Sequence, residues 1–159
     1  MNEILESLYR RKSVRRYDSR PVPQEVKCQL LEAAAQAPTA CNQQRYTILD
    51  ITDPGIKQAL AGICGDQRFM AQAPVMLVFC ADNRRWLDGF QAADCAPRRP
   101  GANDLMLAVI DAVIAAQNTV VAAESLGLGS CYIGNIMAQY QAHRELLGQP
   151  EFGVPAVIL

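Results

Sequence analysis

The chain has few residues of the kinds that hold metal ions. It contains one histidine, His143, and none of its cysteines form a C-x-x-C pair. Zinc and iron–sulfur centres in small domains need clusters of such ligands, so we expect no metal site. We also expect reduced thiols, several of them buried. The six cysteines are Cys28, Cys41, Cys64, Cys80, Cys95 and Cys131.

An excess of charge of one sign is also lacking. The net charge is −1 over 159 residues, and 19% of the residues are charged. No overall field attracts the chain to nucleic acid or to a membrane, so a local cluster must hold any anion it binds. The first six residues are acidic and amphipathic, without the apolar segment of a signal peptide. We therefore expect a cytoplasmic protein.

Long hydrophobic runs are limited to residues 105–126. This run could span a bilayer by length, but it contains Asp111, Gln117 and Glu124 and has no flanking basic anchors. A buried core helix is the better interpretation. Half of the residues are hydrophobic, and the length is that of one domain, so we expect residues 1–159 to form a single unit.

Hydrophobic periodicity predicts helices that alternate with strands. The expected helices are a short one around Ile4 to Leu8, then 24–36, 54–63, 104–126 and 137–147. The expected strands are 46–51, 75–80, 130–133 and 154–159. Residues 82–103 are expected to be irregular, and so long a connection is often functional. His143, beside Arg144 and Glu145, is expected at the surface. The alternation favours helices packed on a mixed sheet.

Basic residues gather in one segment, Arg10–Tyr17, where five of eight residues are basic. In an extended segment, Arg11, Ser13 and Arg15 project to the same side. Two guanidinium groups and a hydroxyl would suit a phosphate, which arginine binds with two parallel hydrogen bonds. A solvated basic turn is the alternative. Nucleic-acid binding is a weaker one, because no aromatic residues interleave the charges.

A second segment, 37–44, follows an expected helix and precedes a strand. Asn42 and Gln43 offer donors and acceptors that would suit a heterocycle with alternating C=O and N–H groups. Taken alone, the segment fits ordinary turn chemistry better.

A third segment, 127–135, is rich in glycine. Gly127 and Gly129 begin a G-x-G, but Tyr132 stands where the dinucleotide fingerprint needs its third glycine. The Rossmann motif therefore fails, and the chain has no Walker A loop. A strand that ends at Gly134 would let the backbone approach a flat ligand closely.

Taken in order, these segments resemble the FMN-dependent nitroreductase family. The motifs are R-R-x-S-x-R-x-[FY] at Arg10–Tyr17, A-P-[ST]-x-x-N-x-Q at Ala37–Gln44 and G-L-G-x-C-x-I-G at Gly127–Gly134. Ala73-Pro74-Val75 and an Asp111-x-x-x-Ala-Ala-Gln-Asn118 helix also fit. The likeness runs from Leu8 to Leu159. Each motif is weak alone, and their shared order and spacing make the likeness specific.

The resemblance implies an α+β fold with three layers, α-β-α. Its mixed sheet would have four to five strands flanked by helices. It also implies a homodimer with a long central core helix and a flavin at the subunit interface. The implied activity is hydride transfer from NADH or NADPH, through FMN, to a nitroaromatic, quinone or enone in two steps. Because the chemistry is centred on the flavin, no catalytic side chain is expected.

The resemblance also implies roles for single residues. Arg15 would lie near the pyrimidine edge of the flavin, where its charge would stabilise the anionic reduced form. The residues implied at the phosphate are Arg11, Lys12 and Ser13. Those implied to reach the flavin of the partner subunit are Pro38, Thr39, Ala40 and Asn42. Those implied beside the ring are Tyr132, Ile133 and Gly134.

The chain departs from the family pattern at two places. Asp66 and Phe69 stand where many members have Asn and Lys against the flavin, so Gln67 is expected to substitute. Family chains also continue past the last strand into an arm with a basic pair, which this sequence lacks. We expect weaker phosphate binding, by about 1.5–3 kcal/mol for each lost charge-assisted bond.

Three functional alternatives to an FMN-dependent reductase of small acceptors remain open. The same fold could perform reductive dehalogenation or flavin fragmentation, because fold does not decide chemistry. A flavin-binding protein without turnover is another reading. In the reductase reading, residues 82–103, with Trp86 and Phe90, are the expected lid over the acceptor.

Overall fold

The computed structural model describes residues 2–159. Its long helices are α2 (Gln24–Ala35), α3 (Pro54–Ile63) and α5 (Ala102–Ser125), and its shorter ones are α1 (Glu3–Arg10), α4 (Arg84–Ala92) and α6 (Tyr140–Leu146). The strands are β1 (Tyr46–Asp50), β2 (Leu77–Asp82) and β3 (Gly153–Ile158). Three 3₁₀ turns, η1 (Ala40–Asn42), η2 (Arg68–Gln72) and η3 (Gly134–Met137), complete the elements.

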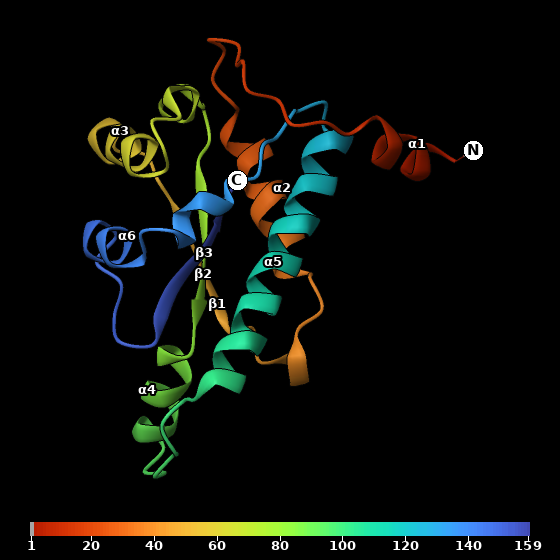
Figure 1. Cartoon of the computed structure of the whole chain (residues 1–159). Helices are drawn as coiled ribbons and strands as arrows, with labels where there is room; N and C mark the ends of the chain where they lie inside the picture. The colour runs from red at the N-terminus through yellow and green to blue at the C-terminus, as the bar shows by residue number, and fades with distance from the viewer. Residues whose placement is uncertain (1) are drawn as a thin grey trace.

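The elements form three layers with the sheet in the middle (Figure 1). Helices α2 and α5 cover one face, where Leu77 and Phe79 of β2 join an apolar cluster with alanines of α5. Helices α3 and α6 cover the other face, where Val78 and Cys80 join a second cluster. Successive side chains of a strand point to opposite faces, so a continuously apolar β2 is what a sheet covered on both sides requires.

The sheet is smaller than the sequence predicts, and it is antiparallel instead of mixed. Within residues 2–159, its three strands have the order β1-β2-β3, and both pairs are antiparallel. The prediction of a mixed sheet with four to five strands is wrong for these residues. Residues 130–133 form only isolated bridges, Ser130 with Ser13 and Ile133 with Ile158. Because this segment pairs briefly with two different partners, it builds a continuous ladder with neither.

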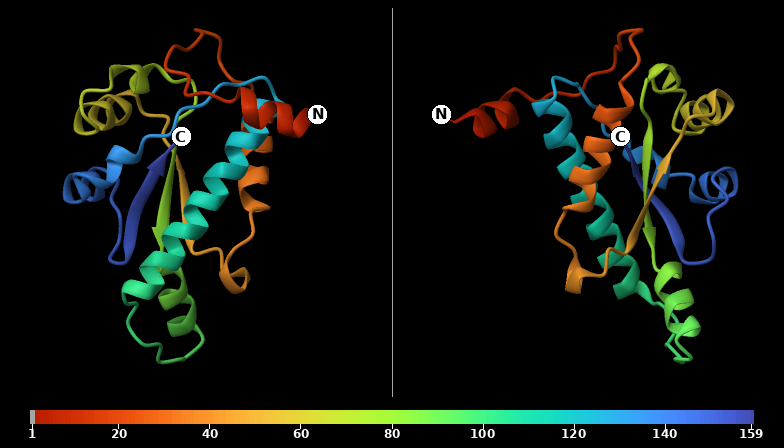
Figure 2. Two further views of the ribbon diagram at one scale, coloured as in Figure 1. Left: turned by 45° about the vertical axis from the view of Figure 1, so that its right-hand side comes forward. Right: turned by 180° about the vertical axis from the view of Figure 1, so that it is seen from behind.

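Helix α5 is the longest element, with 24 residues and a length of about 36 Å. Its inward face is lined by small residues, including Ala108, Ala112 and Ala116, which are fully buried. The two views of Figure 2 show α5 beside α2 and the sheet. Small side chains at the contact allow this approach. By length and composition alone α5 could cross a membrane, but here it packs on α2 and all three strands.

The connection between β2 and α5 contains a helix that the sequence analysis does not predict. Residues 84–92 form α4, so the expectation of an irregular 82–103 is wrong for this part. The Asp82 carboxylate accepts hydrogen bonds from the backbone N–H groups of Arg84 and Arg85, which begins the helix. Trp86 and Phe90 lie one turn apart, with ring centroids 5.6 Å apart. Residues 93–101 remain irregular.

The surface position expected for His143 is also wrong. The side chain is fully buried, because α6 turns it toward the end of α3. Its Nε2 lies 3.3 Å from the Sγ atom of Cys64, and its Nδ1 lies 2.9 Å from the carbonyl oxygen of Gln139. The cysteines meet expectation: Cys64, Cys80 and Cys131 are buried, and all six are free thiols.

Candidate functional site

The basic segment and the glycine-rich segment lie side by side. The backbone N–H of Val14 donates to the carbonyl oxygen of Ser130 at 2.9 Å. The two backbones approach so closely that a Cβ atom on Gly129 would lie 2.5 Å from Cγ2 of Val14. Only glycine fits at this crossing without moving its neighbour. Arg11–Arg15 is thereby fixed beside the chain that leads into Tyr132, Ile133 and Gly134.

The charge of Arg11 reaches the glycine-rich segment. Burial raises the pKa of Tyr132 to about 12, and the nearby positive charge of Arg11 opposes that shift. The phenol of Tyr132 donates to Oε1 of Gln117 on α5 at 3.2 Å. Arg11 and Tyr132 therefore belong to one neighbourhood, with the tyrosine ring oriented by the core helix.

Arg15 lies next to the turn that follows α3. Its guanidinium carbon is 6.0 Å from the centre of the Phe69 ring, which also contacts Tyr17. Gln67, two residues earlier, donates from Nε2 to the carbonyl oxygen of Cys64 at 2.7 Å, so one of its amide N–H bonds is used within the chain. Asp66 forms an ion pair with Arg68, in which Oδ2 and Nη2 lie 3.3 Å apart. The turn therefore places Phe69 against Arg15, and its one carboxylate already has a cation as its partner.

The cations of the basic segment are available to an anion. None of the ion pairs found within residues 2–159 includes Arg11, Lys12 or Arg15. Lys12, Ser13 and Arg15 are exposed, and Arg11 is half-buried. Three unpaired positive charges held by an ordered backbone, with a hydroxyl among them, form a site that suits a phosphate group.

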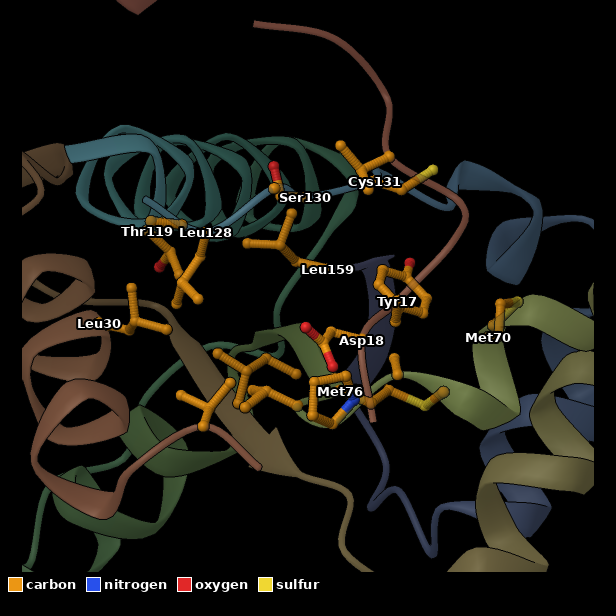
Figure 3. A pocket seen from close by; sticks show the side chains of 18 of the residues that line it. Tyr17, Asp18, Leu30, Met70, Met76, Thr119, Leu128, Ser130, Cys131 and Leu159 are labelled. Carbon is orange, nitrogen blue, oxygen red and sulfur yellow. The ribbon is translucent and has the colours of Figure 1, made fainter. Parts of the chain in front are cut away.

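An apolar cleft of about 610 Å³ lies on the other side of the basic segment (Figure 3). Val14 and Arg16 line it, together with Tyr17, Met76 and Leu128, whereas Arg11, Ser13 and Arg15 do not. Val14 and Arg16 therefore face the cleft, and Tyr17, the next residue, faces it too. A common orientation of Arg11, Ser13 and Arg15 stays a prediction.

The second segment lies apart from the other two. The backbone N–H of Ala40 donates to the Asp111 carboxylate at 3.0 Å, which places the loop beside the first half of α5. The glycine-rich segment follows the other end of that helix, and roughly 20 Å of helix separates Asp111 from Ser125. Figure 1 shows the loop below α2, far from the N-terminal segment. Pro38, Thr39, Ala40 and Asn42 cannot share a small ligand with the basic segment of their own chain.

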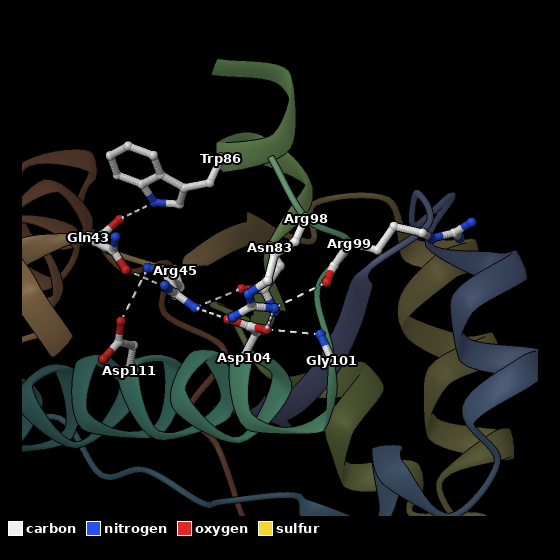
Figure 4. Close-up of polar contacts among 9 residues, drawn as sticks. All are labelled: Gln43, Arg45, Asn83, Trp86, Arg98, Arg99, Gly101, Asp104 and Asp111. Atoms are coloured by element: carbon white, nitrogen blue, oxygen red, sulfur yellow. Dashed lines mark hydrogen bonds and ion pairs between the residues drawn. The ribbon is translucent and has the colours of Figure 1, made fainter. Parts of the chain in front are cut away.

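Polar contacts hold the second segment against α5 and α4 (Figure 4). Arg45 donates from Nη1 to Asp104 at 3.0 Å and from Nε to Gln43 at 2.6 Å. The pKa of Asp104 lies far below its usual range, because Arg98, the Gly101 N–H and Arg45 all donate to its carboxylate. The Asp104 carboxylate is therefore ionised at neutral pH, and its bond to Arg45 helps keep the loop on the helix.

Asp111 and Phe69 lie near these segments, although neither is among the site residues expected from the sequence. Asp111 is 1% exposed and binds loop 40–45, and its presence in an apolar helix was the available signal. Phe69 lies against Arg15, but its position in the sequence identified it only as a departure from the family pattern.

A model of the nitroreductase family matches residues 8–68 and 63–159 of the chain. An FMN reductase [NAD(P)H] of Bacillus subtilis is 36% identical over 157 residues, which are 98% of this chain and 63% of that protein. An oxygen-insensitive NADPH nitroreductase of Salmonella typhimurium is 35% identical over 156 residues, with the same coverage. The chain thus spans less than two thirds of the length of these relatives.

Solved structures show the same fold. NfrA2 of Bacillus megaterium superposes with a TM-score of 0.94 at 32% identity, over 99% of this chain and 65% of that one. The NADPH:FMN oxidoreductase of Vibrio harveyi, solved with NAD+, superposes with a TM-score of 0.91 at 28% identity, over 99% and 66% of the two chains. The three-layer arrangement is therefore shared along the whole described chain.

Proposed function

The chain belongs to the nitroreductase family, and from that premise we propose that it binds FMN and passes hydride from NADH or NADPH to a small organic acceptor. The nicotinamide would leave before the acceptor binds. The observation that carries the proposal is the group of unpaired cations, Arg11, Lys12 and Arg15, fixed beside the glycine-rich segment. We propose that residues 1–159 act as one flavin-binding domain located in the cytoplasm.

The residues present fit the chemical groups of FMN. Arg11, Lys12 and Ser13 would bind the phosphate, because two cations and a hydroxyl complement its charge and its acceptor oxygens. Arg15 would stabilise negative charge at the pyrimidine edge. FMN, when bound, supplies the hydride-transfer chemistry that no side chain can perform.

The residues proposed beside the ring come from two other parts of the same chain. Gln67 keeps an amide N–H and an acceptor oxygen beyond the one bond it makes to Cys64. Gly134 is exposed, so no side chain prevents a flat ring from lying against its backbone. The remaining residues proposed at this edge are Tyr132 and Ile133.

A second copy of the chain would complete the site. Loop 38–42 lies too far from the basic segment to touch the same flavin, so we propose that it contacts the flavin of a partner subunit in a homodimer. Helix α5 offers a surface for that assembly, because Met106, Ile110 and Val113 are 62%, 49% and 42% exposed along one face. Exposed apolar stripes of this kind mark interfaces between proteins.

The acceptor would enter beside α4. Arg85 donates to the carbonyl oxygens of Gln44 and Tyr46, and the indole N–H of Trp86 donates to Gln43 at 2.7 Å. These contacts fix α4 to the segment that would reach the partner's flavin. We propose that Trp86 and Phe90 form a wall of the acceptor pocket, for a nitroaromatic, quinone or enone.

Titration of the purified protein with FMN tests the proposal. Arg11→Ala and Arg15→Ala should each weaken FMN binding by roughly 10- to 100-fold, the loss expected for one charge-assisted hydrogen bond. Arg20→Ala is the matched control, because Arg20 is an exposed arginine near the same segment that already pairs with Asp18. Unchanged affinity in both test variants would show that the basic segment is not the phosphate site.

Turnover is tested on the loaded protein under anaerobic conditions. Loss of the yellow flavin absorbance with NADH or NADPH, and its return with a quinone, is the expected result. A yellow protein whose absorbance stays constant with both nucleotides would identify a flavin-binding protein without reductase activity.

A further inference from the structure

The loop between α2 and β1 has a strained backbone. Cys41, Asn42 and Gln44 have φ values of 53°, 55° and 42°, in the left-handed region that residues other than glycine rarely adopt. Cys41 and Asn42 are also exposed, so apolar packing does not hold them in place. Hydrogen bonds must therefore offset the free-energy cost of these left-handed backbone conformations.

Asp111 provides two hydrogen bonds that join this loop to α5, while the Gln44 N–H closes the turn by donating to the Thr39 hydroxyl at 3.2 Å. Its Oδ1 accepts from the backbone N–H of Ala40 at 3.0 Å, and its Oδ2 accepts from the backbone N–H of Arg45 at 3.2 Å. The residues it joins lie immediately on either side of the left-handed turn. One carboxylate thus fixes both ends of the strained segment to the core helix.

The same carboxylate depends on the loop. Asp111 is 1% exposed, and none of the ion pairs found in the described chain includes it. A buried carboxylate without a cation needs hydrogen-bond donors, and the two loop amides are the donors it has. If the loop relaxed, the charge would be left buried and unsatisfied. The carboxylate and the loop conformation therefore stabilise each other.

A second carboxylate on the same helix face strengthens this attachment. Asp104 lies two turns before Asp111 and binds the side chain of Arg45, whose backbone N–H binds Asp111 (Figure 4). Asp104 also takes Arg98 as a partner, so it would stay paired without the loop. Asp111, by contrast, accepts hydrogen bonds from the loop backbone and from no other group in the described chain.

We propose that Asp111 is the positioning residue for the second half of the flavin site and that it acts across the subunit interface. This inference rests on the proposed function. Asp111 holds Thr39, Ala40 and Asn42 in the shape that contacts the flavin, but that flavin is bound by the basic segment of the other subunit. Its loss should therefore weaken the site of the neighbouring chain and leave the site of its own chain intact.

The variant Asp111→Asn tests the positioning role with little change in volume. It replaces one acceptor oxygen with an N–H donor that faces a backbone N–H, so one end of the loop loses its attachment. We expect FMN to bind roughly tenfold more weakly or worse. Thr119→Val is the matched control, because Thr119 is equally buried on α5 and its hydroxyl bonds only to Ala115 of the same helix. The control should bind FMN as the unaltered chain does.

Mixed dimers separate a role across the interface from a general loss of structure. Differently tagged chains are co-expressed so that one carries Arg15→Ala and the other Asp111→Asn. In this dimer one site has an intact basic segment and an intact opposing loop, so one FMN per dimer should bind with unaltered affinity. When both substitutions are on one chain and the other is unaltered, each site has one damaged half, and no site should bind with that affinity.

The opposite pattern would overturn the inference. If Asp111 acts within its own subunit, or only supports folding there, the first mixed dimer loses its good site and the second keeps one. Equal FMN affinity of the Asp111→Asn and unaltered homodimers would also refute it. If the unaltered protein does not bind FMN, or if Arg15→Ala has no effect, the proposed function itself fails. Light scattering establishes that each sample contains two copies.

Discussion

At the scale of single residues, His143 has a defined protonation state. The carbonyl oxygen of Gln139 can only accept, so Nδ1 carries the hydrogen and the lone pair of Nε2 faces Cys64. Burial raises the pKa of Cys64 to about 11, which keeps its thiol protonated and able to donate. Burial also lowers the pKa of His143, so the ring is neutral. A neutral thiol–imidazole pair thus joins α3 to α6.

This pair predicts a specific dependence of stability on pH. The ordinary histidine pKa is 6.5 and the folded value is lower, so below about pH 6.5 the unfolded chain binds a proton that the folded chain excludes. The free energy of unfolding should therefore decrease as the pH falls from about 6.5 to the folded pKa. His143 is the only histidine, so one imidazole signal in an NMR titration reports that pKa directly.

The variant His143→Gln removes this titration. We expect a loss of about 1–3 kcal/mol in the free energy of unfolding at pH 8, because the hydrogen bonds to Cys64 and Gln139 are disturbed. Urea unfolding at pH 8 and pH 5.5 should then show a smaller pH effect in the variant than in the unaltered chain. Equal pH effects in the two proteins would mean that His143 titrates normally in the fold.

The wrong placement of His143 has a local cause. Its neighbours Arg144 and Glu145 are polar, and a short polar helix indicates a surface position. The buried face of α6 is set by Cys64 at the end of α3, which lies 79 residues away in the sequence.

The role of Asp111 also depends on tertiary contacts. A carboxylate in an apolar helix is visible in the sequence, but its partners Ala40 and Arg45 become neighbours only when the chain folds.

At the scale of elements, periodicity predicts most helices and all three strands of the sheet correctly. Helices α2, α3 and α5 and strands β1, β2 and β3 lie within a few residues of their expected limits. Their apolar spacing reflects one buried face, which is a local property of the sequence. The motif at Arg10–Tyr17 also predicts that Arg11–Arg15 is involved in a site, but it does not predict that Gly129 lets this segment cross the glycine-rich one.

The missed elements depend on tertiary partners. Residues 130–133 have the composition of a strand, but they bridge Ser13 and then Ile158 and extend neither contact. Helix α4 has an acidic residue, Asp82, that caps its start, and aromatic residues one turn apart, but its many polar residues favour a loop. In both cases the available neighbours decide the structure, and the sequence pattern does not.

The crossing at Gly129 yields a prediction for the two segments that meet there. In Gly129→Ala the new methyl group would lie 2.5 Å from Cγ2 of Val14, so Val14 must move with the basic segment. We expect a loss of about 1–3 kcal/mol in the free energy of unfolding, as for overpacked cores, together with weaker FMN binding. Chemical denaturation and FMN titration measure the two effects.

Gly89→Ala in α4 is the control for this variant. Apart from the adjacent residues and the backbone of α4 itself, no atom lies within 4 Å of the added methyl group, and helix propensity favours alanine by up to about 1 kcal/mol. It should leave FMN affinity unchanged. If Gly129→Ala behaves in the same way as Gly89→Ala, the close contact does not constrain the basic segment.

At the scale of the whole molecule, α5 separates the two groups of proposed flavin residues. The family resemblance implies a role for each group, but their separation along a helix of about 36 Å becomes visible only in the structure. The resemblance implies a role for loop 38–42 in the partner's site, and the distance along α5 supports that role. The assembly remains a proposal for this chain.

The exposed face of α5 gives a prediction about assembly. In Ile110→Glu, a charge replaces a side chain that is 49% exposed in the single chain and would be buried between two copies. An unpaired charge in a buried interface is strongly unfavourable, so we expect the dissociation constant of the dimer to rise at least tenfold. Sedimentation at several protein concentrations measures this change.

Gln58→Glu places a charge at an exposed position of α3, on the other side of the sheet from α5, and serves as the comparison. A mass that stays at two subunits for Ile110→Glu, or at one subunit for the unaltered chain, would show that this face is not the interface. Circular dichroism checks that each variant keeps its helices.

Because α5 separates the loop from the basic segment, the amount of FMN that the protein retains would depend on the concentration of the protein itself. In the proposed dimer, every complete site takes its two halves from different polypeptides, so each bound FMN also holds two subunits together. Dilution would release flavin even where the affinity of a complete site is high, and added flavin would drive assembly. The proportion of yellow protein would then rise with expression level, as a direct readout of how many subunits have found a partner.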